Sequence, residues 1–387
     1  MLSETGLRQL LGRQGKQPDT ELTLCVGPWA HGQWSGGEGV TRLGNVSFAE
    51  RTEEQFRERV ELPFLRRHLM SSTVHQHQQP ALSAVGNQSP PPPLAPPQLP
   101  TAVVFEVGTN QWRTFSQWPP DGARPRALYF MPGGILELGS SPARAAGQLQ
   151  ESNHPASGDC RGGFAEWVSD PARPVPYTND LCIGMTREHM TDDQRPWARR
   201  PDVAVHHSTV LDEDLTVVGP IRVSIVISST GTDSDFIVKL IDCHSDDHPN
   251  PTPAETAAAA DGDTTAAWNT ATRVPVEMAG YQQLVRGEPF RAKFRNSFET
   301  PEALTPGTPT LLEFTMPDIC HTFRRGHRLA VHVQSSWFPL VRRHPSCKIH
   351  IVYIFIYNIY GASYREDGGE PPCTAYSACH RITSECA

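Results

Sequence analysis

The chain has 387 residues, which is enough for two or three domains. Hydrophobic residues make up 38% of it, and its 36 prolines and 30 glycines favour loop-rich, β-rich structure over a helical bundle. The net charge of −8 comes without an extended basic patch, which excludes typical nucleic-acid-binding proteins, and the longest apolar stretch (349–360) is too short for a membrane-spanning helix.

The N-terminus shows no basic segment followed by an apolar one, so we expect no secretory signal and favour a cytoplasmic location. The nine cysteines are irregularly spaced, contain no Cys-x-x-Cys pair and are odd in number. This pattern indicates reduced thiols rather than a complete disulfide framework. No motif predicts a bound cofactor.

Residues 1–70 are typical of the end of an α/β domain. We expect a helix over 2–13, a polar loop over 16–19 and a strand over 22–26, which ends in a Gly-Pro turn and delivers His31 at its tip. A second helix is expected over 52–70, broken at Pro63 and packed back on the sheet. The strand before His31 is expected to belong to a parallel sheet whose neighbouring strands lie outside the chain.

The composition changes twice after this region. Residues 71–101 contain no Asp, Glu, Lys or Arg and are rich in Pro and Gln, so we expect a disordered insertion. Residues 102–345 contain short alternating runs between turn residues, which predicts an antiparallel β-sandwich or jelly roll with a low-complexity loop over 250–272. Its strands are expected at 103–107, 126–131, 203–208, 221–228, 236–241, 310–315 and 328–334. The alternation ends after Pro345, so 346–387 are expected to form an irregular tail outside the sandwich.

A series of motifs in a fixed order makes the sequence recognisable. The first is Gly27-Pro-Trp-Ala-His31-Gly. It is followed by Phe105-Glu-Val-Gly-Thr-Asn-Gln-Trp112-Arg, Trp118-Pro-Pro, Ser169-Asp-Pro-Ala-Arg-Pro-Val-Pro-Tyr177, Asp193-Gln-Arg195, Arg200-Pro-Asp202, Gly231-Thr-Asp233-Ser-Asp235, Gly280-Tyr281-Gln, Arg291-Ala-Lys-Phe-Arg-Asn-Ser297, His321-Thr-Phe-Arg-Arg-Gly-His327-Arg and Ser335-Ser-Trp337-Phe-Pro339. Over 1–345, less the two insertions, this order resembles the CocE/NonD family of serine hydrolases. That family includes X-Pro dipeptidyl-peptidases, and these motifs are most similar to those of its α-amino acid ester hydrolase and glutaryl acylase branch.

The resemblance implies both a fold and a function. The fold would be the C-terminal remnant of an α/β-hydrolase domain followed by an all-β, galactose-binding-like jelly roll. The activity would be hydrolysis of small acyl esters, amides or peptides through an acyl-enzyme, without nucleic acid, membrane or cofactor, and with oligomers possible. One triad residue is carried over: His31, as the general base that takes the proton of a serine.

The other two triad members have no counterpart in the sequence. A G-x-S-x-G nucleophile elbow does not occur. The most similar segment, Gly361-Ala-Ser363-Tyr364, lacks the closing glycine and comes after His31 in the chain, whereas the serine of the family precedes the histidine. Asp19 lies at the wrong end of the strand that leads to His31. We therefore expect the serine and the aspartate upstream of Met1, so that this chain is a C-terminal fragment, inactive alone.

Several alternatives stay open. The sandwich could be a non-catalytic module that binds carbohydrate or a protein partner, since jelly rolls host such functions. Asp233 and Asp235 could bind Ca²⁺, although a turn whose carboxylates pair with backbone N–H groups or with Lys239 is favoured.

Histidines and aromatic residues leave further alternatives. His206 and His207 point to opposite faces of a strand and cannot chelate one ion. His244 and His248 could hold a metal, but a solvated loop is favoured. The tail residues Cys373, Cys379, His380 and Cys386 lack zinc-finger spacing, and Trp112, Trp118, Trp337 and Phe338 are interpreted as core rather than pocket residues.

Overall fold

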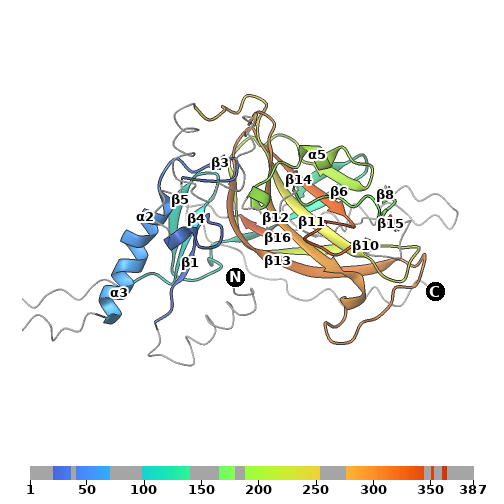
Figure 1. The fold of residues 1–387 in the computed structure, drawn as a ribbon, viewed down its shortest axis with the longest axis horizontal. Helices are drawn as coiled ribbons and strands as arrows, with labels where there is room; N and C mark the ends of the chain where they lie inside the picture. Colours follow the sequence, from blue (N-terminus) through green and yellow to red (C-terminus); the bar gives the residue numbers. More distant parts are fainter. Residues whose placement is uncertain are drawn as a thin grey trace, which may run out of the picture.

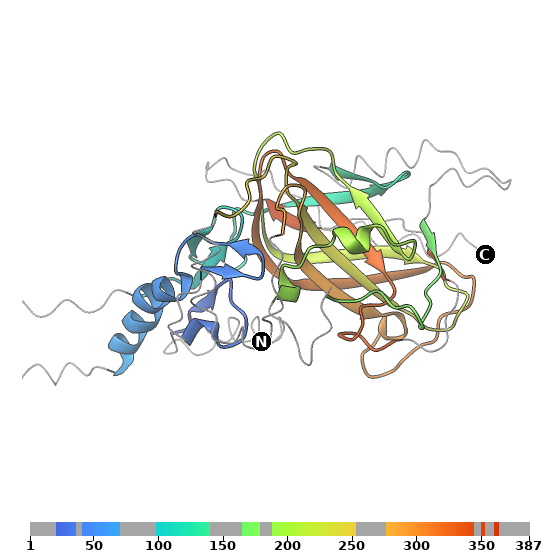
Figure 2. The same ribbon diagram turned by 45° about the horizontal axis from the view of Figure 1, so that its top comes forward.

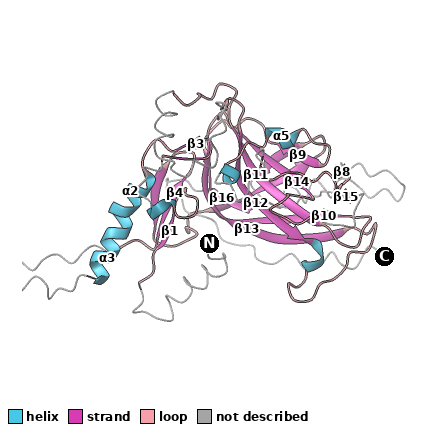
Figure 3. Ribbon diagram, in the orientation of Figure 1, coloured by secondary structure: helices cyan, strands magenta, loops and turns pink. Residues whose placement is uncertain are grey.

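The structure, a computed structural model, describes residues 21–35, 41–69, 98–139, 165–178, 188–252, 276–343, 350–352 and 360–363. Strands dominate these residues, and helices are few and short (Figure 3). The helix predicted over 2–13, the loop over 16–19, nearly all of 71–101, most of 250–272 and most of the tail lie outside the described residues. No helix among the described residues is long and apolar enough to cross a membrane.

A curved sheet of nine strands forms the body of the molecule (Figures 1 and 2). Its order is β12-β11-β14-β9-β7-β6-β16-β10-β13. The strands are β6 (Arg124–Met131), β7 (Ile135–Gly139), β9 (Val203–His207), β10 (Leu215–Ile227), β11 (Asp235–Cys243), β12 (Gln282–Arg291), β13 (Thr310–Phe323), β14 (Arg328–Gln334) and β16 (Tyr360–Ser363).

Three smaller groups of strands accompany this sheet. The first is a three-stranded sheet in the order β1-β4-β5, made of β1 (Leu24–Val26), β4 (Ala102–Glu106) and β5 (Gln111–Phe115). The other two are pairs: β2 (Arg42–Leu43) with β3 (Val46–Ser47), and β8 (Ala165–Trp167) with β15 (His350–Val352). Short helical segments lie between the strands: η1 (Gln33–Ser35), α2 (Thr52–Phe56), η2 (Arg57–Glu61), α3 (Leu62–Leu69), η4 (Glu188–Met190), α5 (Arg195–Ala198) and η6 (Ala292–Phe294).

The nine-stranded sheet curls until its two end strands meet. Phe290 of β12 stacks on Phe314 of β13 with ring centroids 4.8 Å apart. Arg286 of β12 donates a 2.8 Å hydrogen bond to the carbonyl of Asp318 in β13. The enclosed core is aliphatic and aromatic, because alternate residues of β10 from Ile221 to Ile227 all point inward and are at most 1% exposed. The fold is therefore mostly β and consistent with the expected β-sandwich.

Alternation located the strands well. Each of the seven strands predicted between 103 and 334 forms, as β4, β6, β9, β10, β11, β13 and β14. Strands β5, β7, β8 and β12 were not predicted. Residues of β12 are mostly only partly buried and polar, as in Gln282, Arg286 and Glu288, so the strand lacks the apolar rhythm on which the prediction rested.

Two predictions for residues 1–70 need correction. The strand before His31 does pair in parallel, but its partner is β4 of this same chain, in the register Leu24↔Ala102. The helix is not broken at Pro63: α2, η2 and α3 run continuously from Thr52 to Leu69. The turn η2 is π-helical, with the Leu62 N–H bonded to the Arg57 carbonyl, and this local widening lies directly before the proline that lacks an N–H.

The expectation that no strand follows Pro345 is wrong for two segments. β16 lies between β6 and β10 in the middle of the nine-stranded sheet, and β15 pairs with β8. Both pairings join segments that are far apart in sequence, so the local residue pattern of the tail carried no signal for them.

Two neighbouring residues of β13 test the core. Leu312 is fully buried, so Leu312→Ala is expected to lower the free energy of unfolding by about 2–5 kcal/mol. Leu311 is 49% exposed, and Leu311→Ala is expected to cost less than about 1 kcal/mol. Urea denaturation of both variants measures the difference, and equal losses would contradict the placement of the core.

Candidate functional site

His31 lies at the tip of a loop that leaves the small sheet. β1 ends at Val26, the Gly27-Pro28 turn follows, and η1 begins at Gln33. The Gln33 side chain accepts a 2.7 Å hydrogen bond from the backbone N–H of Ala30. The His31 side chain is exposed, and its ring meets that of Trp34 edge-on at 5.8 Å. The sequence therefore correctly placed His31 in the turn after a short strand, five residues beyond the end of β1.

Trp29 holds this loop against two elements. Its Nε1–H donates a 2.8 Å hydrogen bond to the Thr52 hydroxyl at the start of α2. Its ring lies 5.2 Å from Phe56 of α2 and 5.6 Å from Trp112 of β5. The helix thus packs on the small sheet as predicted, and it does so through the residue two positions before His31.

The small sheet is fixed to the large one at the end of β4. The backbone N–H of Val107 donates to the Cys320 carbonyl at 3.1 Å, and the Val107 carbonyl accepts from the Thr322 N–H at 2.8 Å. Gly108 follows with φ +97°, and a Cβ there would lie 2.0 Å from the Thr322 carbonyl oxygen, so only glycine fits. Buried apolar residues of both sheets meet in one cluster beside this contact, namely Leu24, Ala102, Val104, Phe115, Val218 and Cys320.

The pair β2–β3 adds a second contact beside the His31 loop. Tyr281 is fully buried, and its hydroxyl donates to the Thr191 carbonyl at 2.9 Å. The Thr191 hydroxyl in turn donates to the Leu43 carbonyl of β2 at 2.9 Å. Ala30, Phe48 and Phe105 pack in the same apolar cluster as Tyr281. The loop is therefore supported from the small sheet, from β2–β3 and from the large sheet.

A triad around His31 is not assembled from the residues that the structure describes. Within that part of the chain the His31 ring makes no hydrogen bond or ion pair, and Trp34 is its ring contact. Ser363 does not stand at a nucleophile elbow, because its backbone is paired with Val217 on one side and Arg124 on the other. Asp19 lies outside the described residues.

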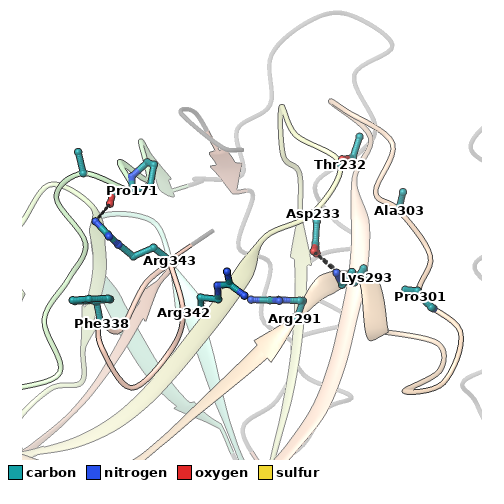
Figure 4. A pocket seen from close by; sticks show the side chains of 11 residues that line it. Pro171, Thr232, Asp233, Arg291, Lys293, Pro301, Ala303, Phe338, Arg342 and Arg343 are labelled. Carbon is teal, nitrogen blue, oxygen red and sulfur yellow. Dashed lines mark hydrogen bonds and ion pairs between the residues drawn. The ribbon is translucent and has the colours of Figure 1, made fainter. Parts of the chain in front are cut away.

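A pocket of about 1250 Å³ lies on the sandwich (Figure 4), and His31 is not among the residues that line it. Arg291, Lys293, Arg342 and Arg343 line it together with one carboxylate, Asp233. Figure 4 shows Arg342 and Arg291 reaching toward one another across the pocket. Phe338 lines it too, so of the four aromatic residues interpreted as core this one faces the pocket, while Trp337 is 3% exposed.

The charges of this pocket explain the Asp233 and Asp235 motif. Asp235 accepts two hydrogen bonds from Arg291, at 2.7 and 2.8 Å. Asp233 accepts the Lys293 backbone N–H at 3.2 Å and forms an ion pair with its ammonium at 3.5 Å. Both carboxylates are thus engaged by cations, as the turn interpretation requires, but the partners are Arg291 and Lys293 rather than Lys239.

Lys239 instead belongs to the interior. It is fully buried, its ammonium donates to Gln194 Oε1 at 3.0 Å and lies 4.8 Å from the Trp337 ring centroid, and burial lowers its pKa to about 7. His206 packs against Phe130 at 4.3 Å, whereas His207 Nδ1 lies 3.9 Å from Cys243 Sγ, so the two histidines face different surroundings as predicted. His244 and His248 flank a loop whose Asp246 and Asp247 are exposed, as expected, but their rings lie 4.3 Å apart and His244 is buried.

Comparison with known proteins gives one family and several relatives. The family model described as "X-Pro dipeptidyl-peptidase C-terminal non-catalytic domain" matches residues 97–349. The cocaine esterase of Rhodococcus sp. (strain MB1 Bresler) is 24% identical over 363 residues, which cover 94% of this chain and 50% of that protein. The chain therefore spans about half the length of this curated relative.

Two solved structures share the fold. An aminopeptidase from a marine sediment archaeon, Thaumarchaeota archaeon, is 27% identical with a TM-score of 0.68, and the match covers 92% of this chain and 52% of that one. A selenomethionine-labelled α-amino acid ester hydrolase is 26% identical with a TM-score of 0.65, over 92% of this chain and 53% of the other.

Two tryptophans beside His31 test how the loop is held. Trp29→Ala removes the ring between α2 and β5 and the hydrogen bond to Thr52. It is expected to lower the free energy that holds the helix on the small sheet by about 1–3 kcal/mol. Limited proteolysis within 52–69 is therefore expected to accelerate by roughly 5–150-fold. Trp34→Ala is the control, because Trp34 is 38% exposed, and equal acceleration in both variants would contradict the anchoring role of Trp29.

Proposed function

Because the chain belongs to the family of X-Pro dipeptidyl-peptidase C-terminal, non-catalytic domains, we propose that it is the C-terminal part of a serine hydrolase in which His31 is the general base. The resemblance to CocE/NonD hydrolases is confirmed by the family match and by the relatives. The serine and the aspartate are proposed to come from the half of the family's length that this chain does not span. The substrates are small acyl esters, amides or peptides.

The position of His31 is the observation that carries this proposal. In α/β hydrolases the triad residues stand on loops beyond the carboxyl ends of parallel strands. β1 pairs in parallel with β4, and the loop after β1 presents an exposed imidazole whose main chain is fixed by Trp29 and Gln33. Residues 1–70 are accordingly proposed to be the end of the hydrolase domain, and 102–345 to form the jelly roll.

In the proposed mechanism, His31 transfers a proton. A serine hydroxyl is a weak nucleophile at neutral pH, and a histidine within hydrogen-bond reach accepts its proton during attack on the acyl carbon. The same histidine then returns the proton to the leaving group. The carboxylate partner fixes the tautomer of the imidazole and stabilises its charged form. An imidazole without hydrogen bonds to other described residues leaves both ring nitrogens available for these two partners.

A fluorophosphonate probe, which reacts with activated serines, tests the assignment. The 387-residue chain is expected to stay unlabelled, because no serine hydroxyl among the described residues bonds His31. Genomic DNA upstream of Met1 is expected to encode Gly-x-Ser-Tyr-x-Gly and a turn bearing an aspartate. In the protein extended by those residues, His31→Ala is expected to reduce the labelling rate by at least about a thousandfold.

His68→Ala is the matched control, because His68 is also an exposed histidine of the N-terminal region and it pairs with Glu21 at 3.4 Å. It should leave labelling unchanged. Stoichiometric labelling of the 387-residue chain, or non-coding DNA upstream of Met1, would contradict the proposal.

The pocket of Figure 4 favours a second candidate function, a binding module for an anionic carbohydrate. Four cationic side chains face one carboxylate there. Arg291 and Lys293 are held by carboxylates, and Arg343 donates to the Pro171 carbonyl at 3.2 Å. Arg342 is exposed and makes no hydrogen bond or ion pair with other described residues, so its guanidinium is available for a ligand carboxylate.

Calorimetric titration with trigalacturonate tests this second function. Arg342→Glu is expected to weaken binding by roughly 10–100-fold, since a hydrogen bond to a charged group contributes about 1.5–3 kcal/mol. Arg66→Glu, on an exposed position of α3, makes the same charge change elsewhere and should have no effect. Equal weakening by both variants would mean that binding depends only on the net charge of the protein, and it would contradict a binding site at Arg342.

A further inference from the structure

A cluster of histidines around one buried carboxylate lies at one end of the nine-stranded sheet, and neither proposed function uses it. Asp242 stands near the end of β11 and is 2% exposed. Its Oδ1 lies 2.8 Å from His327 Nδ1, and its Oδ2 lies 2.9 Å from His321 Nε2. His321 comes from β13 and His327 from the turn between β13 and β14, so three neighbouring segments meet at this carboxylate.

Two further imidazoles complete the cluster. The His244 ring stacks on that of His327 with centroids 4.9 Å apart. The His248 ring lies 4.3 Å from His244 and 5.6 Å from His327. His244, His321 and His327 are at most 9% exposed, whereas His248 is half-buried at the rim. The cluster is therefore buried except at His248, which is partly exposed.

One ring nitrogen of His244 is buried and carries a lone pair. His244 Nε2 lies 3.3 Å from Gln283 Oε1, and since an amide oxygen only accepts, Nε2 carries the hydrogen. Nδ1 then carries the lone pair, and it is buried without a hydrogen-bond partner. A buried acceptor without a partner is costly, which points to a bound cation.

The spacing of these groups suits a small ion. One ligand atom each from Asp242, His244 and His327 can be chosen so that all lie within 4.8 Å of one another. Ligand atoms at about 2.0–2.1 Å from a tetrahedral ion lie roughly 3.4 Å apart, and the centroids of two ligating imidazoles about 5 Å apart. The three ring separations of 4.3, 4.9 and 5.6 Å bracket that value, and His248, which is outside the three-residue group, would turn its ring toward the ion.

We propose that Asp242, His244 and His327, with His248 as the fourth ligand, form a binding site for a divalent transition-metal ion of the Zn²⁺ class. Three imidazoles and one carboxylate form a donor set that Zn²⁺ accepts. To bind the ion, His327 needs a lone pair on its ligating nitrogen, so its hydrogen sits on the other ring nitrogen and the imidazole stays neutral. His321 and Gln283 stay hydrogen-bonded to Asp242 and His244, as outer partners that orient the ligands.

The ion would stabilise the joint between the two sheets. The backbone of His321 is bridged to Val107, the residue that follows β4, while its side chain holds Asp242. The backbone N–H of His244 donates to the Tyr281 carbonyl at 2.9 Å, which fixes the main chain that carries this ligand. The proposed role is therefore structural, and it does not depend on the assignment of His31.

The full chain, freed of metal with EDTA and dialysed, tests the site. Titration with Zn²⁺ is expected to load about one ion per chain by elemental analysis and to raise the thermal midpoint. Co²⁺ is expected to give the intense visible absorption of a four-coordinate ion. His248→Gln, at the half-buried rim where folding is not at risk, and His244→Gln are each expected to weaken Zn²⁺ binding by at least about tenfold.

His206→Gln is the matched control. His206 is also buried, its Nδ1 also lacks a hydrogen-bond partner, and burial lowers its pKa to about 4. It lies on β9, however, where its ring packs against Phe130 of β6. It should leave Zn²⁺ binding unchanged. The proposal is overturned if the metal-free chain takes up no Zn²⁺, or if binding is the same in the wild type, His244→Gln and His248→Gln, which would assign uptake to other surface groups.

Discussion

The position of one short strand determines how the rest of the molecule fits together. β4 pairs in parallel with β1 on one edge and antiparallel with β5 on the other. Directly after it, Val107 exchanges two backbone hydrogen bonds with β13. Glu106, only 3% exposed, accepts hydrogen bonds from Thr322 at 3.0 Å and from Arg113 at 3.2 Å, so its buried charge is satisfied across the same contact. The loop that carries His31 is thereby fixed relative to the sandwich.

Several charged residues of the family motifs form ion pairs with one another. Arg200 and Asp202 pair with each other, and Arg195 binds Asp193 while also donating to carbonyls of 277 and 279. Asp235 receives Arg291 in a two-bond contact. The first two pairs join residues two positions apart, and the third joins paired positions of β11 and β12. These ion pairs therefore fix local turns and two neighbouring strands.

The sequence predicted the features that depend on local residue patterns, but not those that depend on contacts between distant segments. Alternating apolar residues identified strands such as β10 and β13, because burial of one face needs a period of two. The same logic could not find β16, whose place depends on two distant partners, nor the partnership of β1 with β4 across about 75 residues. The cluster around Asp242 was also hidden, because His321 and His327 lie about 80 residues from it and only the folded sheet brings them together.

The central claim, that β1 and its histidine loop are held on β4 and through it on the sandwich, is tested most directly by hydrogen exchange measured by mass spectrometry. Peptides covering Leu24–Val26 are expected to show protection comparable to peptides covering β4 and the end of β13, because all three share one hydrogen-bonded network. Exchange of 24–26 at the rate of an unstructured chain, with β13 still protected, would contradict it.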